Sequence, residues 1–294
     1  MEAARRIAKG LPSSFSIDNF LDENRENKFI EAAGKLAIVK TIWKEEADSK
    51  MFVAPNNIHN ELNLADLRGT WYTKLSSLIF EGCTKKTLGD RLSRLTLIIF
   101  NYDRCVEHFL FWAIRLTYGM TNGEAADVMK RLTIYHPYGS VGGLPYLTTS
   151  NEVYFGNAEE RNDPWEITKG LKTFTEGVES QQTTAIRQAV LEANMVIFLG
   201  FAFHSLNMAL LYDPKKPPSY RGSTKHYYGT VLGRGKPDIQ LLEARVKAMC
   251  KMADVIGQPR DRKPMANLVP VKCHQLFDEY HASFALERYP DMDV

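Results

Sequence analysis

The chain has 294 residues, of which 44% are hydrophobic and 24% charged, with 37 basic residues against 35 acidic ones. A chain of this length and composition can bury a core as one large domain or two small ones. The formal net charge of +2 gives no electrostatic reason to expect nucleic acid or a membrane surface as a partner. The four cysteines, Cys83, Cys105, Cys250 and Cys273, show no CxxC spacing, which argues against a zinc ribbon and a disulfide framework.

The first residues, MEAARRIAKGLPSS, are charged and lack the apolar segment of a signal peptide. No stretch of the sequence approaches the length of a membrane-spanning helix. We therefore expect a cytoplasmic protein that makes no contact with a membrane.

The first ninety residues are predicted to be nearly all helix. Glu2 to Lys9 has the pattern of a helix that ends at Gly10. Apolar residues at helical spacing predict two consecutive helices within residues 13–52 and a further helix over 64–80. No convincing strand occurs in this part of the chain.

The chain is organised around residues 95–110, LTLIIFNYDRCVEHFL. An apolar run, Leu95 to Phe100, ends in Asn101, Tyr102 and Asp103, after which apolar positions recur at helical spacing. This pattern predicts a buried strand, a polar turn and a helix that ends near Tyr118. Asp103 would also serve as an N-cap for that helix, so a purely structural role for the turn remains open.

Helices and strands then alternate along the rest of the chain. A short helix over 124–132 precedes a strand, Leu132 to Tyr135, and a glycine-rich loop. A helix that ends near Ala193 precedes an apolar strand, Met195 to Leu199. The remaining predicted elements are a strand from Tyr227 to Leu232, a helix over 237–257, a basic loop from Arg260 to Lys263 and a last amphipathic helix over 271–284.

This alternation predicts an α/β fold of Rossmann type, in which helices cover both faces of a parallel sheet. We expect a single domain over 1–294, with a helical portion over 1–90 and a strand-helix core over 91–294. Ligands of such sheets bind beyond the carboxyl ends of the strands. Three strand ends, FNYD, YHPYGS and LGFAFHSLN, would face one crevice and form a nucleotide site from Asn101, Tyr102, Asp103, His136, Tyr138, Gly139, Ser140, Gly200, His204 and Asn207.

The segments FNYDRCVEHFL, HPYGSVGGLP and IFLGFAFHSLNM, in this order, resemble the bacterial sirtuin-like proteins of antiphage defence. SIDNFLDE and GKLAIVKTIWKEE are similar to helical segments that precede the FNYD motif in the same group, so the resemblance covers most of the chain. It implies a Rossmann-type, NAD-binding domain that cleaves NAD to nicotinamide and ADP-ribose and deprives an infected cell of NAD. It also implies a homo-oligomer or a partner defence protein.

Cleavage of the nicotinamide–ribose bond passes through an oxocarbenium-like state and requires a base and a group that positions ribose and water. By the match to the sirtuin Asn-x-Asp motif, Asn101 would hold the ribose or the water, and Asp103 would hold the nicotinamide amide. Either His136 or Tyr138 would be the base, and we favour His136 because an imidazole titrates near neutrality. The resemblance assigns NAD contacts to Phe100, Tyr102, Tyr138, Gly139, Ser140, Gly200, Phe201, His204 and Asn207.

Two features of this family have no counterpart in the sequence. Nothing before Ser16 supplies the Gly-Ala-Gly-x-Ser loop that holds the NAD pyrophosphate, as if roughly forty residues of a βαβ unit were missing. The four-cysteine zinc module of the deacylase sirtuins is also absent, so we expect no metal and no protein deacetylation.

Three functional hypotheses therefore remain open. The FNYD and His136 segments favour an NAD-cleaving defence effector. The missing phosphate loop favours a catalytically silent sirtuin-like module for nucleotide binding or oligomerisation. In the third hypothesis the strand-end residues are only helix caps of a structural subunit.

Overall fold

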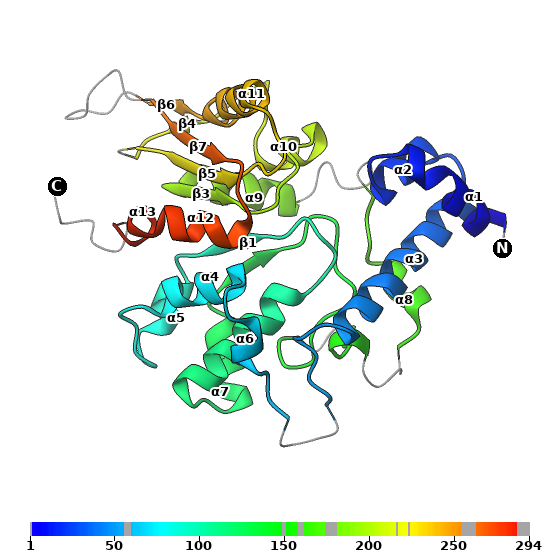
Figure 1. Cartoon of the computed structure of the whole chain (residues 1–294), viewed down its shortest axis with the longest axis horizontal. Coiled ribbons are helices and arrows are strands. Elements are labelled where there is room, and N and C mark those ends of the chain that lie inside the picture. The colour runs from blue at the N-terminus through cyan, green and yellow to red at the C-terminus, as the bar shows by residue number, and fades with distance from the viewer. Residues whose placement is uncertain are drawn as a thin grey trace. The chain divides into compact units, whose positions relative to one another are not determined.

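The computed structural model describes residues 2–55, 60–148, 151–157, 162–173, 181–215, 217–222, 224–253 and 263–286. The protein is a mixed α/β protein with small parallel sheets (Figure 1). It divides into two compact units. The first unit comprises Met1–Arg68 and Ile79–Val178, and the second comprises Gly69–Leu78 and Glu179–Val294.

The first unit is mainly helical, and its residues before 91 contain no strand in the described part of the chain, as the sequence predicts. Its helices and strands are α1 (Glu2–Gly10), α2 (Ile17–Glu23), α3 (Lys28–Ala47), α5 (Leu88–Leu92), β1 (Thr96–Ile98), α6 (Cys105–Tyr118), α7 (Asn122–Met129), β2 (Thr133–Tyr135) and α8 (Pro164–Thr168). Short 3₁₀ turns occur at Leu11–Ser13, Leu64–Leu67 and Phe155–Asn157.

Local capping residues set the start of the early helices. Ser16 accepts the backbone N–H of Asn19 at the start of α2, and Asn27 accepts two backbone N–H groups at the start of α3. The helix predicted over 64–80 is divided into the 3₁₀ turn Leu64–Leu67 and α4 (Trp71–Phe80). Gly69 lies between them with φ +82°, a left-handed conformation that ends a helix.

A buried ion pair joins α3 to the segment that follows β1. Arg104 Nε lies 3.2 Å from Glu46 Oε1, and Arg104 Nη2 lies 2.5 Å from Glu46 Oε2. Both side chains are at most 2% exposed. Arg104 also donates to the carbonyl of Val153 at 2.6 Å, and Glu46 accepts the N–H of Gly156 at 2.8 Å. The two charges therefore have the partners that buried charges require.

Strands β1 and β2 pair in parallel, with Thr96 opposite Thr133 and Ile98 opposite Tyr135. The hydrogen bond from Ile99 N–H to the Tyr135 carbonyl continues the pairing. The two strands predicted from the sequence are confirmed, although each is shorter than its apolar run. Their carboxyl ends lie side by side. The expected burial of the first strand is wrong, because Thr96 is exposed and Leu97 and Ile98 are only half-buried.

The second unit contains a parallel sheet in the order β3-β5-β7 (Figure 1). These strands are β3 (Met195–Phe198), β5 (His226–Thr230) and β7 (Met265–Val269), with Met195 opposite His226 and His226 opposite Met265. The other elements are α9 (Gln181–Glu192), α10 (Ser205–Leu211), α11 (Lys236–Lys247), α12 (Cys273–Glu279), α13 (His281–Leu286) and the paired short strands β4 (Ser219–Tyr220) and β6 (Lys251–Met252).

Helices cover both faces of this sheet. Neighbouring residues of a strand point to opposite faces. Tyr228 packs against Leu276, Phe277 and Phe284 of α12 and α13. Tyr227 points the other way, and its hydroxyl lies 3.5 Å from Cys250 Sγ, beyond the end of α11. The sheet of the second unit is therefore buried on both sides.

Two sequence predictions for the second unit are wrong, and one strand of its sheet is not predicted by the sequence. The helix expected over 237–257 ends at Lys247, because Lys251 and Met252 pair with β4 instead of extending the helix; residues 254–257 lie outside the described residues. The sequence predicts no element over Met265–Val269, but these residues form strand β7, which pairs with the central strand β5. The last amphipathic segment is divided into α12 and α13 at Tyr280.

None of the helices in the described part of the chain is both long enough and apolar enough to cross a membrane.

We predict that Glu46→Gln destabilises the protein by about 3–5 kcal/mol, because the substitution leaves the Arg104 guanidinium buried without its carboxylate. Urea denaturation followed by circular dichroism measures the loss. Asp48→Asn, at the C-cap of the same helix, is the control, since Asp48 pairs with Lys44 at the surface, and we expect it to cost less than about 1 kcal/mol. Equal effects of the two substitutions would contradict the prediction.

We predict that the folded protein loses stability in acid because His108 is buried in its neutral form. Its ring is 2% exposed, its Nε2–H donates to the Met51 carbonyl at 2.8 Å, and its Nδ1 accepts from the Tyr146 hydroxyl at 2.5 Å. Burial lowers the pKa of His108 from 6.5 to about 3. Between these two values the unfolded chain binds the proton and the folded chain does not. Stability therefore falls as the pH falls through this window, by about 1.4 kcal/mol per pH unit at most.

The matched variant is His108→Gln, which can still donate to the Met51 carbonyl but does not titrate. We expect it to be less stable than the wild type at pH 7.5 and to lose less stability between pH 6.5 and 4.5. Urea midpoints measured across this range test the point. Parallel curves for the two proteins would show that His108 is not the titrating group.

Candidate functional site

The parallel pairing of β1 and β2 brings two polar segments together in the first unit. Asn101 follows β1 and His136 follows β2, and the last paired residues of these strands are Ile98 and Tyr135. Asn101 is exposed to solvent. Two of the segments predicted to form a site therefore lie at one edge of one sheet, the edge where ligands of parallel sheets bind.

His136 is held by a carboxylate that sequence analysis did not select. His136 Nε2 lies 2.6 Å from Glu107 Oε1, and the two side chains are 15% and 10% exposed. Because a carboxylate only accepts hydrogen bonds, Nε2 carries the proton in this contact. Within the described residues, His136 Nδ1 and Glu107 Oε2 are buried and have no hydrogen-bond partner. The pair can hold a proton and orient the imidazole, as a carboxylate does for a histidine base.

Tyr102 anchors the turn after β1, and its side chain is buried. Its hydroxyl lies 2.7 Å from Asp18 Oδ1 and 3.0 Å from the Lys172 carbonyl. Burial raises the pKa of Asp18, and the hydrogen bond from Tyr102 only partly offsets this effect. The Val141 N–H donates to the Tyr102 carbonyl at 3.0 Å, so the turn is also joined to the loop after β2.

The N-cap of α6 is Arg104, one residue after the Asp103 that the sequence suggested, but Asp103 still contacts the start of the helix. One of its carboxylate oxygens, Oδ1, accepts the N–H of Cys105 at 3.1 Å, at the start of α6. This contact uses only one carboxylate oxygen. The structural role of Asp103 therefore leaves the other oxygen for a ligand.

The loop after β2 is tightly packed. Tyr138 is 2% exposed, and its ring meets the edge of Phe100 at a centroid distance of 6.1 Å. Burial, followed by the nearby Asp18 carboxylate, raises the pKa of Tyr138. Gly139 has φ +82°, and a Cβ at this position would lie 2.1 Å from the Gly170 carbonyl oxygen, so only glycine fits. Ser140 Oγ lies 3.4 Å from the Gly142 carbonyl, a long hydrogen bond.

The remaining predicted residues lie in the second unit, at the carboxyl end of β3. Gly200 has φ +61°, and its N–H donates to Thr230 Oγ1 at 2.9 Å. Phe201 packs against the rings of Phe198 and Phe203, and Asn207 is 8% exposed. His204 caps α10, because its Nδ1 accepts the N–H of Leu206. His204 therefore has the structural role of an N-cap.

Glu107 and Asp18 are the residues that sequence reasoning missed. Glu107 lies in the first turn of α6, where an acidic residue usually complements the helix dipole. In the sequence, Glu107 could have been found because it lies among the apolar residues Val106, Phe109 and Leu110. A charge on the apolar face of a helix needs a partner. Asp18 carried no comparable signal.

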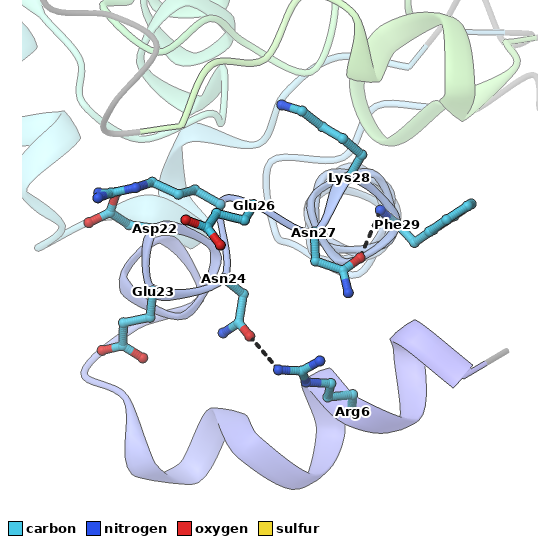
Figure 2. Close-up of a pocket in the computed structure, with 9 residues that line it drawn as sticks. Arg6, Asp22, Glu23, Asn24, Glu26, Asn27, Lys28 and Phe29 are labelled. Atoms are coloured by element: carbon cyan, nitrogen blue, oxygen red, sulfur yellow. Dashed lines mark hydrogen bonds and ion pairs between the residues drawn. The ribbon is translucent and has the colours of Figure 1, made fainter.

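A surface hollow of about 840 Å³ lies in the first unit around the end of α2 and the start of α3, and none of the predicted site residues lines it. Figure 2 shows its mostly polar and charged lining and the hydrogen bond from Arg6 to the side-chain oxygen of Asn24, Oδ1; the donor–acceptor distance is 3.0 Å. Three basic and three acidic side chains line it, so it shows no preference for a ligand of one charge.

Among the residues that the structure describes, no three histidine, cysteine or acidic side chains are grouped so that they could hold a metal ion. Comparison of the chain with protein-family models, with curated proteins and with solved structures gives no match in any of the three. The class of the protein is therefore that of its fold, an α/β protein with parallel strands and a polar cluster at one strand edge.

We predict that Glu107→Gln changes the tautomer of His136. In the wild type, neutral His136 should carry its proton on Nε2, because Glu107 only accepts. A glutamine amide can accept or donate, so the variant should contain both tautomers. Nitrogen-15 NMR of the histidine rings distinguishes them. Glu166→Gln, at an exposed ion pair with Lys169, is the control; unchanged His136 shifts in Glu107→Gln would contradict the assignment.

Proposed function

We propose that the protein is a sirtuin-like NAD glycohydrolase, which cleaves NAD to nicotinamide and ADP-ribose. The observation that carries the proposal is that two groups follow the carboxyl ends of the paired strands β1 and β2: an exposed amide, Asn101, and a carboxylate-bound imidazole, His136. Hydrolysis at the ribose requires these two kinds of group, one to position ribose or water and one to accept a proton.

In the proposed reaction, Asn101 positions the ribose or the attacking water, and Asp103 holds the nicotinamide amide through its second carboxylate oxygen. His136 accepts the proton of the water, and Glu107 orients its ring. His136 is a better base than Tyr138, because the raised pKa of Tyr138 keeps its phenol protonated at neutral pH. The buried His136 Nδ1 requires the loop after β2 to move when substrate binds.

The proposed fold of the catalytic domain is Rossmann-like, of the sirtuin type. The parallel strands in both units and the helices on both faces of β3-β5-β7 support this proposal. In the second unit, the resemblance makes Gly200, Phe201, His204 and Asn207, at the carboxyl end of β3, candidate contacts of NAD. Gly200 supports this role, since its positive φ allows the backbone to turn sharply at a strand end.

The proposed biological role follows from the resemblance of the sequence. The protein would act in the cytoplasm in antiphage defence by depleting NAD, as a homo-oligomer or together with a partner defence protein. The chemistry proposed for the site requires no metal.

A second candidate is a catalytically silent nucleotide-binding or oligomerisation module. The packing of the loop after β2 favours it, because Tyr138 and His136 Nδ1 are closed off from solvent. Calorimetric titration with NAD distinguishes the two candidates: NAD that binds without release of nicotinamide supports the silent module.

The primary test is nicotinamide release from NAD, followed by liquid chromatography. We expect Asn101→Ala and His136→Ala to lower the rate by about 10²–10⁴-fold, the usual contribution of a positioned acid–base group. Tyr138→Phe should keep most of the activity, and Glu166→Gln is the surface control. Loss of activity in Tyr138→Phe but not in His136→Ala would transfer the role of base to Tyr138, and no release by the wild type would reject the hydrolase.

A further inference from the structure

The second unit contains a pocket of about 240 Å³ that none of the residues above lines. One face of α9 forms its wall, together with residues at the C-terminal end of α10, residues just after α11 and the first residues of β5. If each water occupies about 30 Å³, the pocket has room for roughly eight waters. That volume suits a small metabolite and is too small for a dinucleotide.

The pocket lies at the amino ends of the strands. Lys225 and Tyr227, at the start of β5, line it, whereas Gly200 follows the carboxyl end of the parallel strand β3. It is therefore at the opposite edge of the sheet from the residues assigned to NAD in this unit. A ligand here would leave that edge free.

The helix end beside the pocket is already neutralised by a buried lysine. Lys225 is 0% exposed, and its Nζ donates to the carbonyls of Val190 at 2.5 Å, Leu191 at 3.1 Å and Ala193. These contacts use all three ammonium protons and offset the partial negative charge at the C-terminus of α9. Lys225 therefore has no donor left for a ligand.

Arg187, on the α9 wall, retains unused donors. Its Nη2 donates to the Ala209 carbonyl at 2.7 Å, and its Nε is buried with no hydrogen-bond partner within the described residues. No carboxylate of the described residues forms an ion pair with Arg187. Asp213, the acidic residue of the lining, accepts the backbone N–H of Lys215. A guanidinium with free donors matches the two oxygens of a carboxylate.

Apolar side chains provide the rest of the surface. Leu211 and Met249 are 3% and 2% exposed, and Leu191 and Pro218 are half-buried. We propose that this pocket binds a small carboxylate with a compact apolar body, with the carboxylate on Arg187 and the body against these side chains. Such pockets, mostly apolar with a few polar groups that fix orientation, are typical of small-molecule sites.

Isothermal titration calorimetry on the full chain tests the site with benzoate and 4-methylpentanoate as probes, and with the corresponding amides as neutral controls. We expect the carboxylates to bind at micromolar to millimolar concentrations and the amides to bind roughly tenfold more weakly or not at all, since a charge-assisted pair is lost. Arg187→Met should reduce carboxylate affinity by roughly tenfold or more. Arg234→Met, at an exposed arginine of the same unit, should not.

Alkylation of Cys250 gives a second readout that needs no variant. Cys250 lines the pocket and is 5% exposed, so bound benzoate should slow its reaction with iodoacetamide, as followed by mass spectrometry, and leave Cys83 unaffected. No carboxylate binding at millimolar concentration, equal binding of the amides, or unaltered binding by a folded Arg187→Met variant would overturn the proposal. Loss of NAD cleavage in Asn101→Ala has no bearing on it, because the two sites share no residue.

Discussion

The buried ion pair between Glu46 and Arg104 is the constraint on which the first unit depends. It connects residues 58 positions apart, and both charges are removed from water. Such a pair is tolerated only when every remaining donor and acceptor is used. The contacts of Arg104 with the Val153 carbonyl and of Glu46 with the Gly156 N–H meet this condition and join three segments at one point. Because Arg104 directly follows Asp103, the pair also determines where the FNYD turn lies.

The same helix, α3, holds the loop after β2. Trp43 Nε1–H donates to the Val141 carbonyl at 3.0 Å, one turn of helix before Glu46. The turn after β1 and the loop after β2, which carry Asn101 and His136, are therefore both attached to α3. Precise positioning of this kind is what a catalytic constellation requires. The packing of Tyr138 and the buried Nδ1 of His136 describe a closed loop that a substrate would have to open.

In both units, a buried basic side chain donates hydrogen bonds to backbone carbonyl groups. In the first unit, Arg104 combines a carboxylate with carbonyl groups. In the second, Lys225 donates to backbone carbonyls at the end of a helix whose dipole favours a cation. Arg187 differs from both because its Nε lacks a partner in the described chain. This difference is why we assign a ligand to Arg187 and not to the two other basic residues.

Local sequence patterns alone determined most of the helices and the strands β1, β2, β3 and β5, because apolar spacing and residues such as Ser16 and Asn27 act within one turn of chain. The same patterns placed Asn101 and His136 at strand ends. Only the tertiary structure decided that Glu107 is the partner of His136, that Tyr102 is buried against Asp18, and that Met265–Val269 forms a strand. Those features depend on which distant segments become neighbours, and the period of a local pattern carries no information about that choice.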